Sequence, residues 1–385
     1  MRSKDGMVHL LALTVFIVMV GVGIIAPIIP LYADSLGATG FWIGFIYAGF
    51  AISRAIFMPL IGKLSDTRGR KIFITLGLLL YSLISLGYVY STDVYELAGV
   101  RIISGLGSAM VTPIAFAYAA EIAPERGEGK VLGEVGMALS VGIGVGVLLG
   151  GALSDHFGMA VPFYTMGALS AFTLILVIWL FPGEHHEVRR RGSGGYSFKK
   201  ILGYDVVKGV SSFRFVNSFA IGAIMSFLPI YATGLEITPT GIGILLSVNI
   251  MLAGIFQPYF GAFADRINRV WLVFSGSIIS SITLLLIPFA GTFNHLLLLN
   301  IVMGAFGAIA VPASLAMMTD VGRDAGMGSV MGVYNSAMSA GMATGPIISG
   351  LIMDAWDLDQ VFILAGTISC LGSLYFLWCT GSFRG

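Results

Sequence analysis

The sequence predicts an all-α membrane protein whose 12 transmembrane helices form two pseudosymmetric six-helix bundles. Three observations support this fold class: the composition is strongly apolar, twelve apolar segments are each long enough to cross a bilayer, and the second half of the chain repeats the first. Hydrophobic residues make up 57% and charged residues only 11% of the 385 positions. A soluble domain carries about 25% charged residues, so a water-soluble enzyme is excluded.

The net charge is +1, from 21 Lys and Arg against 20 Asp and Glu. Binding to a phosphate backbone needs a concentrated basic surface, so no nucleic-acid partner is expected. The 52 glycines instead suit membrane helices that pack closely.

Each span needs roughly 20 apolar residues to cross a hydrocarbon core of about 30 Å. The segments that satisfy this lie near 8–32, 41–61, 72–91, 95–119, 130–153, 160–181, 207–232, 240–260, 270–290, 295–318, 328–352 and 360–379. Segments such as Leu10–Val20 do not alternate between apolar and polar residues, which favours helices over the strands of a barrel. The first segment is too long for the core of a signal peptide and is therefore counted as a span.

Lys and Arg concentrate on one side of the predicted membrane, as the positive-inside rule requires of cytoplasmic segments. With the N-terminus inside, the inner segments carry Arg2, Lys4, Lys63, Arg68, Arg70, Lys71, Arg126, Lys130, Arg189, Arg190, Arg191, Lys199, Lys200, Arg266, Arg269, Arg323 and Arg384. The outer segments carry acids only: Asp34, Asp93, Asp155, Glu236, Asp354, Asp357 and Asp359. Both termini are therefore predicted to be cytoplasmic, in the cell (inner) membrane.

The two halves align without a gap when the sequence is shifted by 199 positions. The aligned pairs include Pro59 with Pro258, Arg70 with Arg269, Glu121 with Asp320, Gly146 with Gly345, and Asp155 with Asp354. The predicted domains are an N-terminal bundle at 1–182, a cytoplasmic linker at 183–205 and a C-terminal bundle at 206–385. Six spans return the chain to the same side, so the halves are parallel repeats, an arrangement found in secondary transporters. The alternative is an ancient duplication without mechanical meaning.

Two motifs carry a resemblance to a known family. The loop predicted after the second span reads Gly62-Lys-Leu-Ser-Asp66-Thr-Arg-Gly69-Arg70-Lys71, with a degenerate copy from Gly261 to Arg269. The fourth span contains Arg101-Ile-Ile-Ser-Gly105-Leu-Gly107. These motifs resemble those of the major facilitator superfamily, and the resemblance covers essentially the whole chain.

The resemblance implies a cytoplasmic gate, here called the inner latch. Its residues would be Gly62, Asp66, Gly69, Arg70, Glu121, Asp265 and Arg269. It implies that Asp66 faces the start of the eleventh helix, near residues 327–330, and that Arg70 pairs with Glu121. The alternative is a solvated charge cluster that only sets the topology.

The fifth span narrows the resemblance to one branch. Its pattern Gly142-x-x-x-Gly146-Val147-x-x-Gly150-Gly151 is similar to the glycine-rich signature of drug:proton antiporters, with Val147 where that signature has proline. The proline stands instead in the eleventh span, as Pro346. Small residues at every fourth position also suit plain helix packing.

Four charges lie inside predicted spans: Arg54, Arg101, Glu134 and Arg214. Each costs about 2.5–3.5 kcal/mol at the bilayer centre, so each needs a partner or a wet cavity. Glu134 is the candidate for proton coupling, since it is the acid clearly inside a span; the alternative is a static partner for Arg54 or Lys130.

The candidates for substrate binding are Arg101, Asn300, Asn217 and Arg214. Arg101 aligns with Asn300 in the repeat, and the family places their spans around the cavity, so the two side chains would face one ligand. The alternative for Arg101 is a structural pair with Asp34. No motif indicates an enzyme or a metal site.

Together these features predict a secondary active transporter that exports small amphipathic or hydrophobic compounds by rocker-switch alternating access. The proton gradient would supply the energy without any cofactor, and the family resemblance implies a monomer. The alternative is a transporter, for export or for uptake, of an anionic metabolite or a sugar-like solute, because three arginines against one glutamate favour an anion. A sensor and a passive facilitator would share the architecture.

Overall fold

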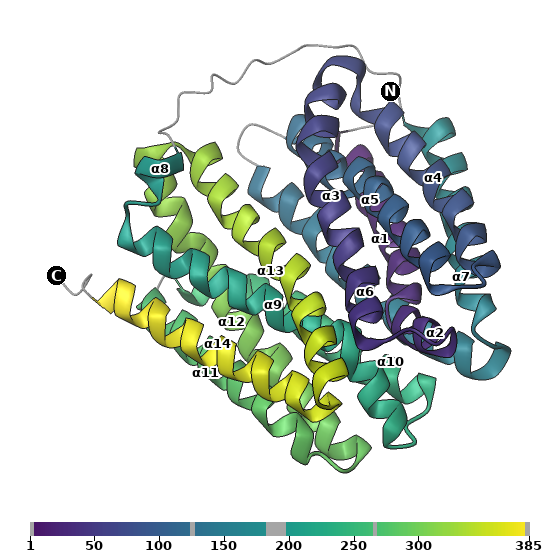
Figure 1. Ribbon diagram of the computed structural model, residues 1–385. Coiled ribbons are helices and arrows are strands. Elements are labelled where there is room, and N and C mark those ends of the chain that lie inside the picture. The colour runs from purple at the N-terminus through teal and green to yellow at the C-terminus, as the bar shows by residue number, and fades with distance from the viewer. Residues whose placement is uncertain (1–3, 124–127, 182–197, 265–267, 382–385) are drawn as a thin grey trace. The chain divides into compact units, whose positions relative to one another are not determined.

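A computed structural model describes residues 4–123, 128–181, 198–264 and 268–381, and over these ranges the chain forms helices and turns without any strand. The elements in chain order are α1 (Lys4–Ile25), α2 (Ile28–Ser35), α3 (Gly40–Arg68), α4 (Arg70–Tyr90), α5 (Val94–Ile122), α6 (Glu128–Phe157), α7 (Ala160–Leu180), α8 (Phe198–Ile201), α9 (Asp205–Gly234), α10 (Pro239–Ala264), α11 (Arg269–Leu286), the 3-10 helix η1 (Ile287–Phe289), α12 (Phe293–Ala325), α13 (Met327–Ala355) and α14 (Leu358–Gly381) (Figure 1).

Within the described ranges, twelve helical segments are long and apolar enough to cross a membrane. They coincide with the twelve predicted spans, and α1 and α2 together make the first, with a break before Ile28. The helices extend beyond the apolar segments; α12, for example, continues to Ala325. Hydropathy marks only the part of a helix that lies in lipid, whereas the backbone hydrogen bonds continue into water.

One local prediction is wrong. The segment from Gly62 to Arg68 was expected to be a loop but forms the last turns of α3. The single residue between α3 and α4 is Gly69, whose φ of 98° lies in the left-handed region that favours glycine. One glycine is therefore enough to end the helix, and the polar residues before it remain helical.

The chain divides into two compact units. Unit 1 comprises Met1–Ala38, Gly49–Arg189 and Glu236–Met251, and unit 2 comprises Thr39–Ala48, Arg190–Leu235 and Leu252–Gly385. The predicted bundles at 1–182 and 206–385 follow the sequence repeat. The units differ from them because the start of α3 groups with unit 2 and the start of α10 groups with unit 1.

Each unit is built around one close helix pair. In unit 1, α6 packs against α1, and a Cβ atom on Gly146 would lie 2.2 Å from the carbonyl oxygen of Val20. In unit 2, α13 packs against α9, and a Cβ on Gly345 would lie 2.4 Å from the carbonyl oxygen of Phe219. These positions correspond in the repeat, so both units use glycine to bring two backbones into contact.

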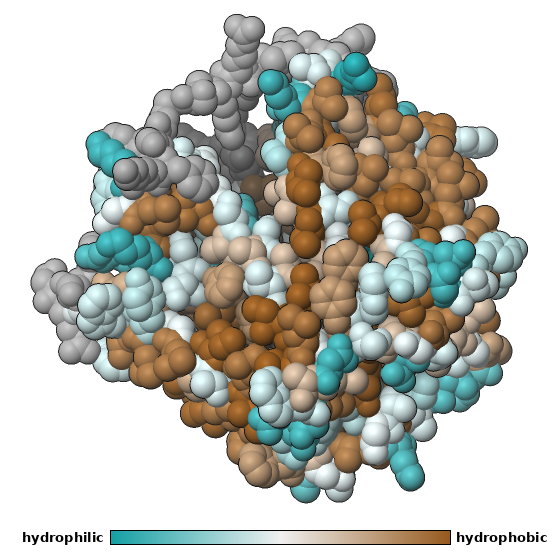
Figure 2. Space-filling model, in the orientation of Figure 1, coloured by the Kyte–Doolittle hydropathy of each residue, from teal (hydrophilic) through white to brown (hydrophobic). Residues whose placement is uncertain are grey.

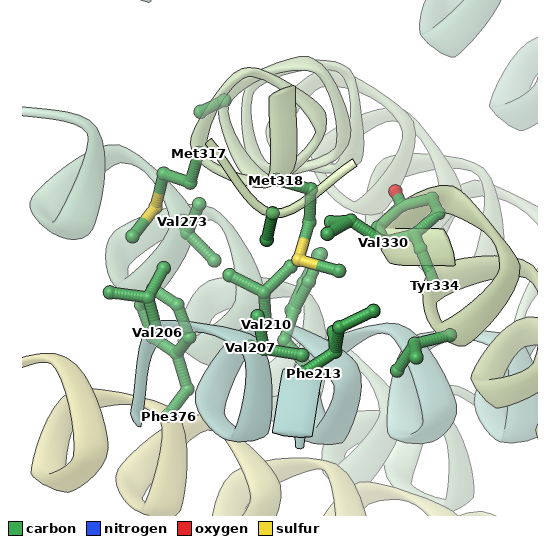
Figure 3. Packing of buried hydrophobic residues seen from close by; sticks show 14 of the residues in the cluster. Val206, Val207, Val210, Phe213, Val273, Met317, Met318, Val330, Tyr334 and Phe376 are labelled. Carbon is green, nitrogen blue, oxygen red and sulfur yellow. The ribbon is translucent and has the colours of Figure 1, made fainter. Parts of the chain in front are cut away.

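The buried core of unit 2 shows how the remaining helices join this pair. Val210 and Phe213 of α9 lie among Met318 of α12, Val330 of α13 and Phe376 of α14 (Figure 3). Residues at every third or fourth position of a helix share one face, so four helices can contribute to one cluster.

The surface carries many large apolar side chains. Trp179 of α7 is 83% exposed and Trp378 of α14 is 75% exposed. Figure 2 shows apolar residues over much of the visible face. Such a surface is unfavourable in water and suits the lipid around a membrane-spanning helix.

We expect Gly146→Ala to lower the melting temperature of the detergent-solubilised protein, because the added methyl group would clash with backbone that cannot move aside. Overpacking of this kind costs about 1–3 kcal/mol. The matched control is Gly136→Ala on the same helix, where nothing lies within 4 Å of the added Cβ. Thermal unfolding followed by tryptophan fluorescence measures both variants, and equal melting temperatures would contradict the close contact.

Candidate functional site

The inner latch of unit 1 is centred on Arg70, the first residue of α4. Its Nη2 lies 2.8 Å from Oε1 of Glu121 and 2.5 Å from Oδ1 of Asp66, and its Nη1 donates to the Ser65 hydroxyl at 2.7 Å. The expected Arg70–Glu121 ion pair is therefore present. The guanidinium joins the end of α3, the start of α4 and the end of α5.

Unit 2 repeats this arrangement at the equivalent end. Arg269, the first residue of α11, forms an ion pair with Asp320 of α12, the residue that aligns with Glu121 in the repeat. Asp265 lies outside the described residues. The predicted contact of Asp66 with residues 327–330 would join the two units and stays a prediction.

Lys71 adds a contact that sequence reasoning missed. Its Nζ donates to the carbonyl oxygens of Ile178 and Phe181, at 3.0 and 2.6 Å. These carbonyls belong to the end of α7, where they have no N–H partner further along the helix. A cation also suits the negative end of the helix dipole.

The two arginines inside unit 1 differ in their surroundings. Arg54 of α3 is half-buried. Arg101 is 6% exposed, and its guanidinium lies 4.5 Å from the centre of the Phe50 ring. A cation over a ring is stabilised by about 2 kcal/mol or more when water is excluded, which offsets part of the cost of burial.

Glu134 is half-buried on α6. It forms no hydrogen bond or ion pair with any residue in the described part of the chain, Arg54 and Lys130 included.

In unit 2 the structure brings two predicted site residues together. Arg214 and Asn217, both on α9, are joined by a bond of 3.4 Å from Nη1 to Oδ1. The guanidinium also lies 5.1 Å from the centre of the Tyr334 ring, and its Nη2 donates to the sulfur of Met338 at 2.7 Å. Tyr334 in turn shares a hydrogen bond of 3.2 Å with Ser314 of α12.

Tyr334 and Met338 were not among the predicted site residues. They stand one helical turn apart on α13, which the close packing against α9 places opposite Arg214. No sequence motif marks them, since a tyrosine and a methionine in an apolar span are usual core residues.

Asn300 is fully buried, and its Nδ2 donates to the carbonyl oxygen of Leu296 at 2.9 Å. Arg101 belongs to unit 1 and Asn300 to unit 2. Their convergence on one ligand therefore stays a prediction.

At the opposite ends of the spans, two carboxylates that align in the sequence repeat accept hydrogen bonds from the first turns of helices. In unit 2, Asp354 of α13 accepts the backbone N–H groups of Gly40 and Phe41, at 2.6 and 2.8 Å. In unit 1, Asp155 of α6 accepts the Thr240 hydroxyl at 2.5 Å. Each carboxylate thus binds the first turn of a helix from the other sequence repeat, where the helix dipole favours negative charge.

We expect Arg70→Ala and Glu121→Ala to be energetically coupled, because each change removes the partner of the other. Glu121 is half exposed, so the coupling free energy should be about 0.5–1 kcal/mol, at the upper end of the range for solvated pairs. A double-mutant cycle on the free energy of unfolding measures it. The control cycle uses Lys208 and Asp205, an exposed i,i+3 pair, and a coupling no larger than that of the control would contradict the latch.

The sequence model of the Major Facilitator Superfamily matches residues 11–208 and 210–383. An uncharacterized MFS-type transporter of Methanocaldococcus jannaschii is 29% identical, over 96% of this chain and 99% of that protein. The quinolone resistance protein NorA of Staphylococcus aureus is 25% identical over 93% of both chains. Multidrug resistance protein 2 of Bacillus subtilis is 25% identical over 94% of this chain and 93% of that one.

Solved structures share the fold at lower identity. A bacterial homolog of the human lysosomal transporter Spinster superposes with a TM-score of 0.84 at 14% identity, over 99% of this chain and 97% of the other. The nucleoside transporter NupG gives a TM-score of 0.79 at 17% identity, over 97% and 99%. With twelve spans, the repeated Arg70 and Arg269 ion pairs and a family match over nearly its whole length, the chain belongs to the Major Facilitator Superfamily, a family of multi-pass membrane transport proteins that are not enzymes.

Proposed function

We propose that the chain is a proton-coupled secondary transporter that exports small amphipathic or hydrophobic compounds from the cytoplasm. The observation that carries this proposal is the similarity to two resistance proteins, NorA and Multidrug resistance protein 2, over more than nine-tenths of the chain. The positive-inside distribution of Lys and Arg predicts that both termini are cytoplasmic.

Glu134 is the proposed proton carrier. A carboxyl group can bind and release a proton, which an amide or an alkyl side chain at the same position cannot. A group already held by an ion pair could not alternate in this way. Glu134 makes no such pair with another described residue, which supports the role.

The proposed substrate-binding residues are Arg101 in unit 1, with Arg214, Asn217 and Asn300 in unit 2. Alternating access would expose them first to one compartment and then to the other by rocking of the two repeats. The transporter would act as a monomer, with the proton gradient as its energy source and without a cofactor.

A second candidate is transport of anionic compounds, and Arg214 favours it. Within the described residues its partners are a side-chain amide, a thioether and an aromatic ring, all of them neutral. A carboxylate on the substrate could accept two parallel hydrogen bonds from the guanidinium and would bring the opposite charge that these partners lack.

We expect Glu134→Gln to reduce proton-driven export by roughly tenfold or more, because glutamine cannot release a proton. Export is measured as dye accumulation in inverted membrane vesicles, with and without a protonophore. Asp324→Asn is the control, since Asp324 is exposed at the end of α12. Export by the parent that is unaffected by the protonophore would indicate a passive facilitator and contradict coupling.

We expect Arg101→Ala and Arg214→Ala to weaken substrate binding, with apparent affinities lowered by about tenfold, or roughly 1.4 kcal/mol. Binding is followed by the fluorescence of a cationic dye and of a carboxylate dye with purified protein. Selective loss of the carboxylate dye in Arg214→Ala would favour the anion transporter. If Glu134→Gln and Arg101→Ala both leave transport unchanged, the site assignment is wrong.

A further inference from the structure

The helix pair of α9 and α13 in unit 2 carries a polar cluster that the matching pair in unit 1 lacks. The cluster consists of Arg214, Asn217, Tyr334 and Met338. The positions that correspond in the repeat, on α1 and α6, are all aliphatic: Val15, Val18, Val135 and Leu139. The three valines are at most 2% exposed. A helix pair of this kind therefore packs well without a cation, and Arg214 needs another explanation than packing.

Arg70 of unit 1 shows how a guanidinium in this protein binds a carboxylate. Its Nε and Nη2 both donate to Oε1 of Glu121, at 3.0 and 2.8 Å. In Arg214 the same edge is used differently. Its Nη2 donates to the sulfur of Met338 at 2.7 Å, and its buried Nε has no hydrogen-bond partner among the described residues. A thioether, which is a weak acceptor, thus occupies the place that a carboxylate takes at Arg70.

The other contacts of the Arg214 guanidinium orient it without neutralising it. Its Nη1 donates to Oδ1 of Asn217 at 3.4 Å, and its carbon lies 5.1 Å from the centre of the Tyr334 ring. The Tyr334 hydroxyl shares a hydrogen bond of 3.2 Å with Ser314, which fixes the ring in turn. A guanidinium that lies over a held ring keeps its planar edge in one direction.

The acids of unit 2 lie away from the middle of its spans. Those in the described part of the unit stand in the first or last two turns of helices or between helices: Asp205, Asp320, Asp324, Asp354, Asp357 and Asp359. Asp205, the acid of α9, comes nine residues before Arg214, about 14 Å along the helix axis. Arg214 accordingly forms no ion pair with any residue that the structure describes.

Methionine suits position 338 because its side chain can be displaced. It has three rotatable bonds, and its sulfur accepts only weak hydrogen bonds. Met338 and Arg214 are both half-buried, so neither side chain is enclosed by the unit. A carboxylate that reaches Arg214 would replace one neutral hydrogen bond by charge-assisted bonds at two nitrogens. An acid at position 338 would instead form a permanent ion pair with Arg214.

We propose that Met338 determines the charge selectivity of the transporter by reserving the Nε–Nη2 edge of Arg214 for a carboxylate of the substrate. The substrate is then an amphipathic carboxylate, whose charged group displaces the Met338 sulfur from Nη2 and also accepts a hydrogen bond from Nε. Tyr334 is a positioning residue, because it orients the guanidinium and leaves its charge in place. The inference rests on the proposed function in that Arg214 is one of the substrate-binding residues.

Binding of a matched pair of ligands to the purified full chain tests this. Pyrenebutanoate and pyrenebutanamide have the same apolar body and differ only in whether the end group is a carboxylate or a neutral amide. Energy transfer from the tryptophans to the pyrene follows the binding of both ligands in the same detergent. We expect the carboxylate to bind about tenfold more tightly than the amide, roughly 1.4 kcal/mol.

Two substitutions of Met338 should have opposite effects. Met338→Glu places a fixed carboxylate at the Arg214 edge and should reduce the preference to about one. Met338→Leu introduces the residue found at Leu139 in unit 1, removes the sulfur that competes for Nη2, and should tighten carboxylate binding about threefold. If Met338→Glu does not fold, Met338→Gln offers Nη2 a stronger acceptor than a thioether and should weaken carboxylate binding about threefold. A methionine with only a structural role would give weaker binding in every variant.

Three outcomes would overturn the inference. The first is equal binding of both ligands by the parent, and the second is an unchanged preference in Met338→Glu. The third is carboxylate binding by Met338→Leu that is as weak as in Met338→Glu.

The binding measurement involves no proton gradient, so it separates this inference from the proposed function. Protonophore-sensitive export by a parent that binds both ligands equally would overturn the role of Met338 alone. A carboxylate preference in a protein without such export would support that role and contradict the proposed coupling.

Discussion

The close contact between two helix backbones in each unit is the interaction on which the rest of the structure depends. Apolar helices in lipid gain no hydrophobic free energy by associating. Their association has to be stabilised by van der Waals contacts at close approach. Gly146 against Val20 in unit 1, and Gly345 against Phe219 in unit 2, provide that approach. The contact also fixes which faces of α6 and α13 turn inward. Arg214 of α9 meets Tyr334 of α13 because these two helices are so near.

A second constraint is the cost of charge inside the spans. Arg101 lies over Phe50, and Arg214 lies over Tyr334. Partners of this kind lower the cost of a buried guanidinium without neutralising it. At the ends of the spans, where water reduces the penalty, Arg70 and Arg269 do form ion pairs with acids.

The features predicted correctly from the sequence are those that leave a pattern along the chain, such as a long apolar segment or a repeated motif. Hydropathy located all twelve spans, and the motif predicted the Arg70–Glu121 pair. The predicted loop before Gly69 was wrong because polarity ends a membrane span without ending a helix. Three features depend on which helix ends meet in space: the hydrogen bonds of Asp155 and Asp354 to the first turns of helices, the Lys71 contact with α7, and a cavity beside Arg269. A one-dimensional pattern contains no such information.

The sharing of α3 between the two units has a mechanical consequence. The helix belongs to unit 2 up to Ala48 and to unit 1 from Gly49 onward. Asp354 accepts a hydrogen bond from the backbone of its first turn, and Asp66 in its last turn forms an ion pair with Arg70. One continuous helix therefore connects the two units, and each of its ends is bound by charged side chains. Long helices curve only gently without a break in their hydrogen bonds, so any rotation of one unit against the other would have to bend α3.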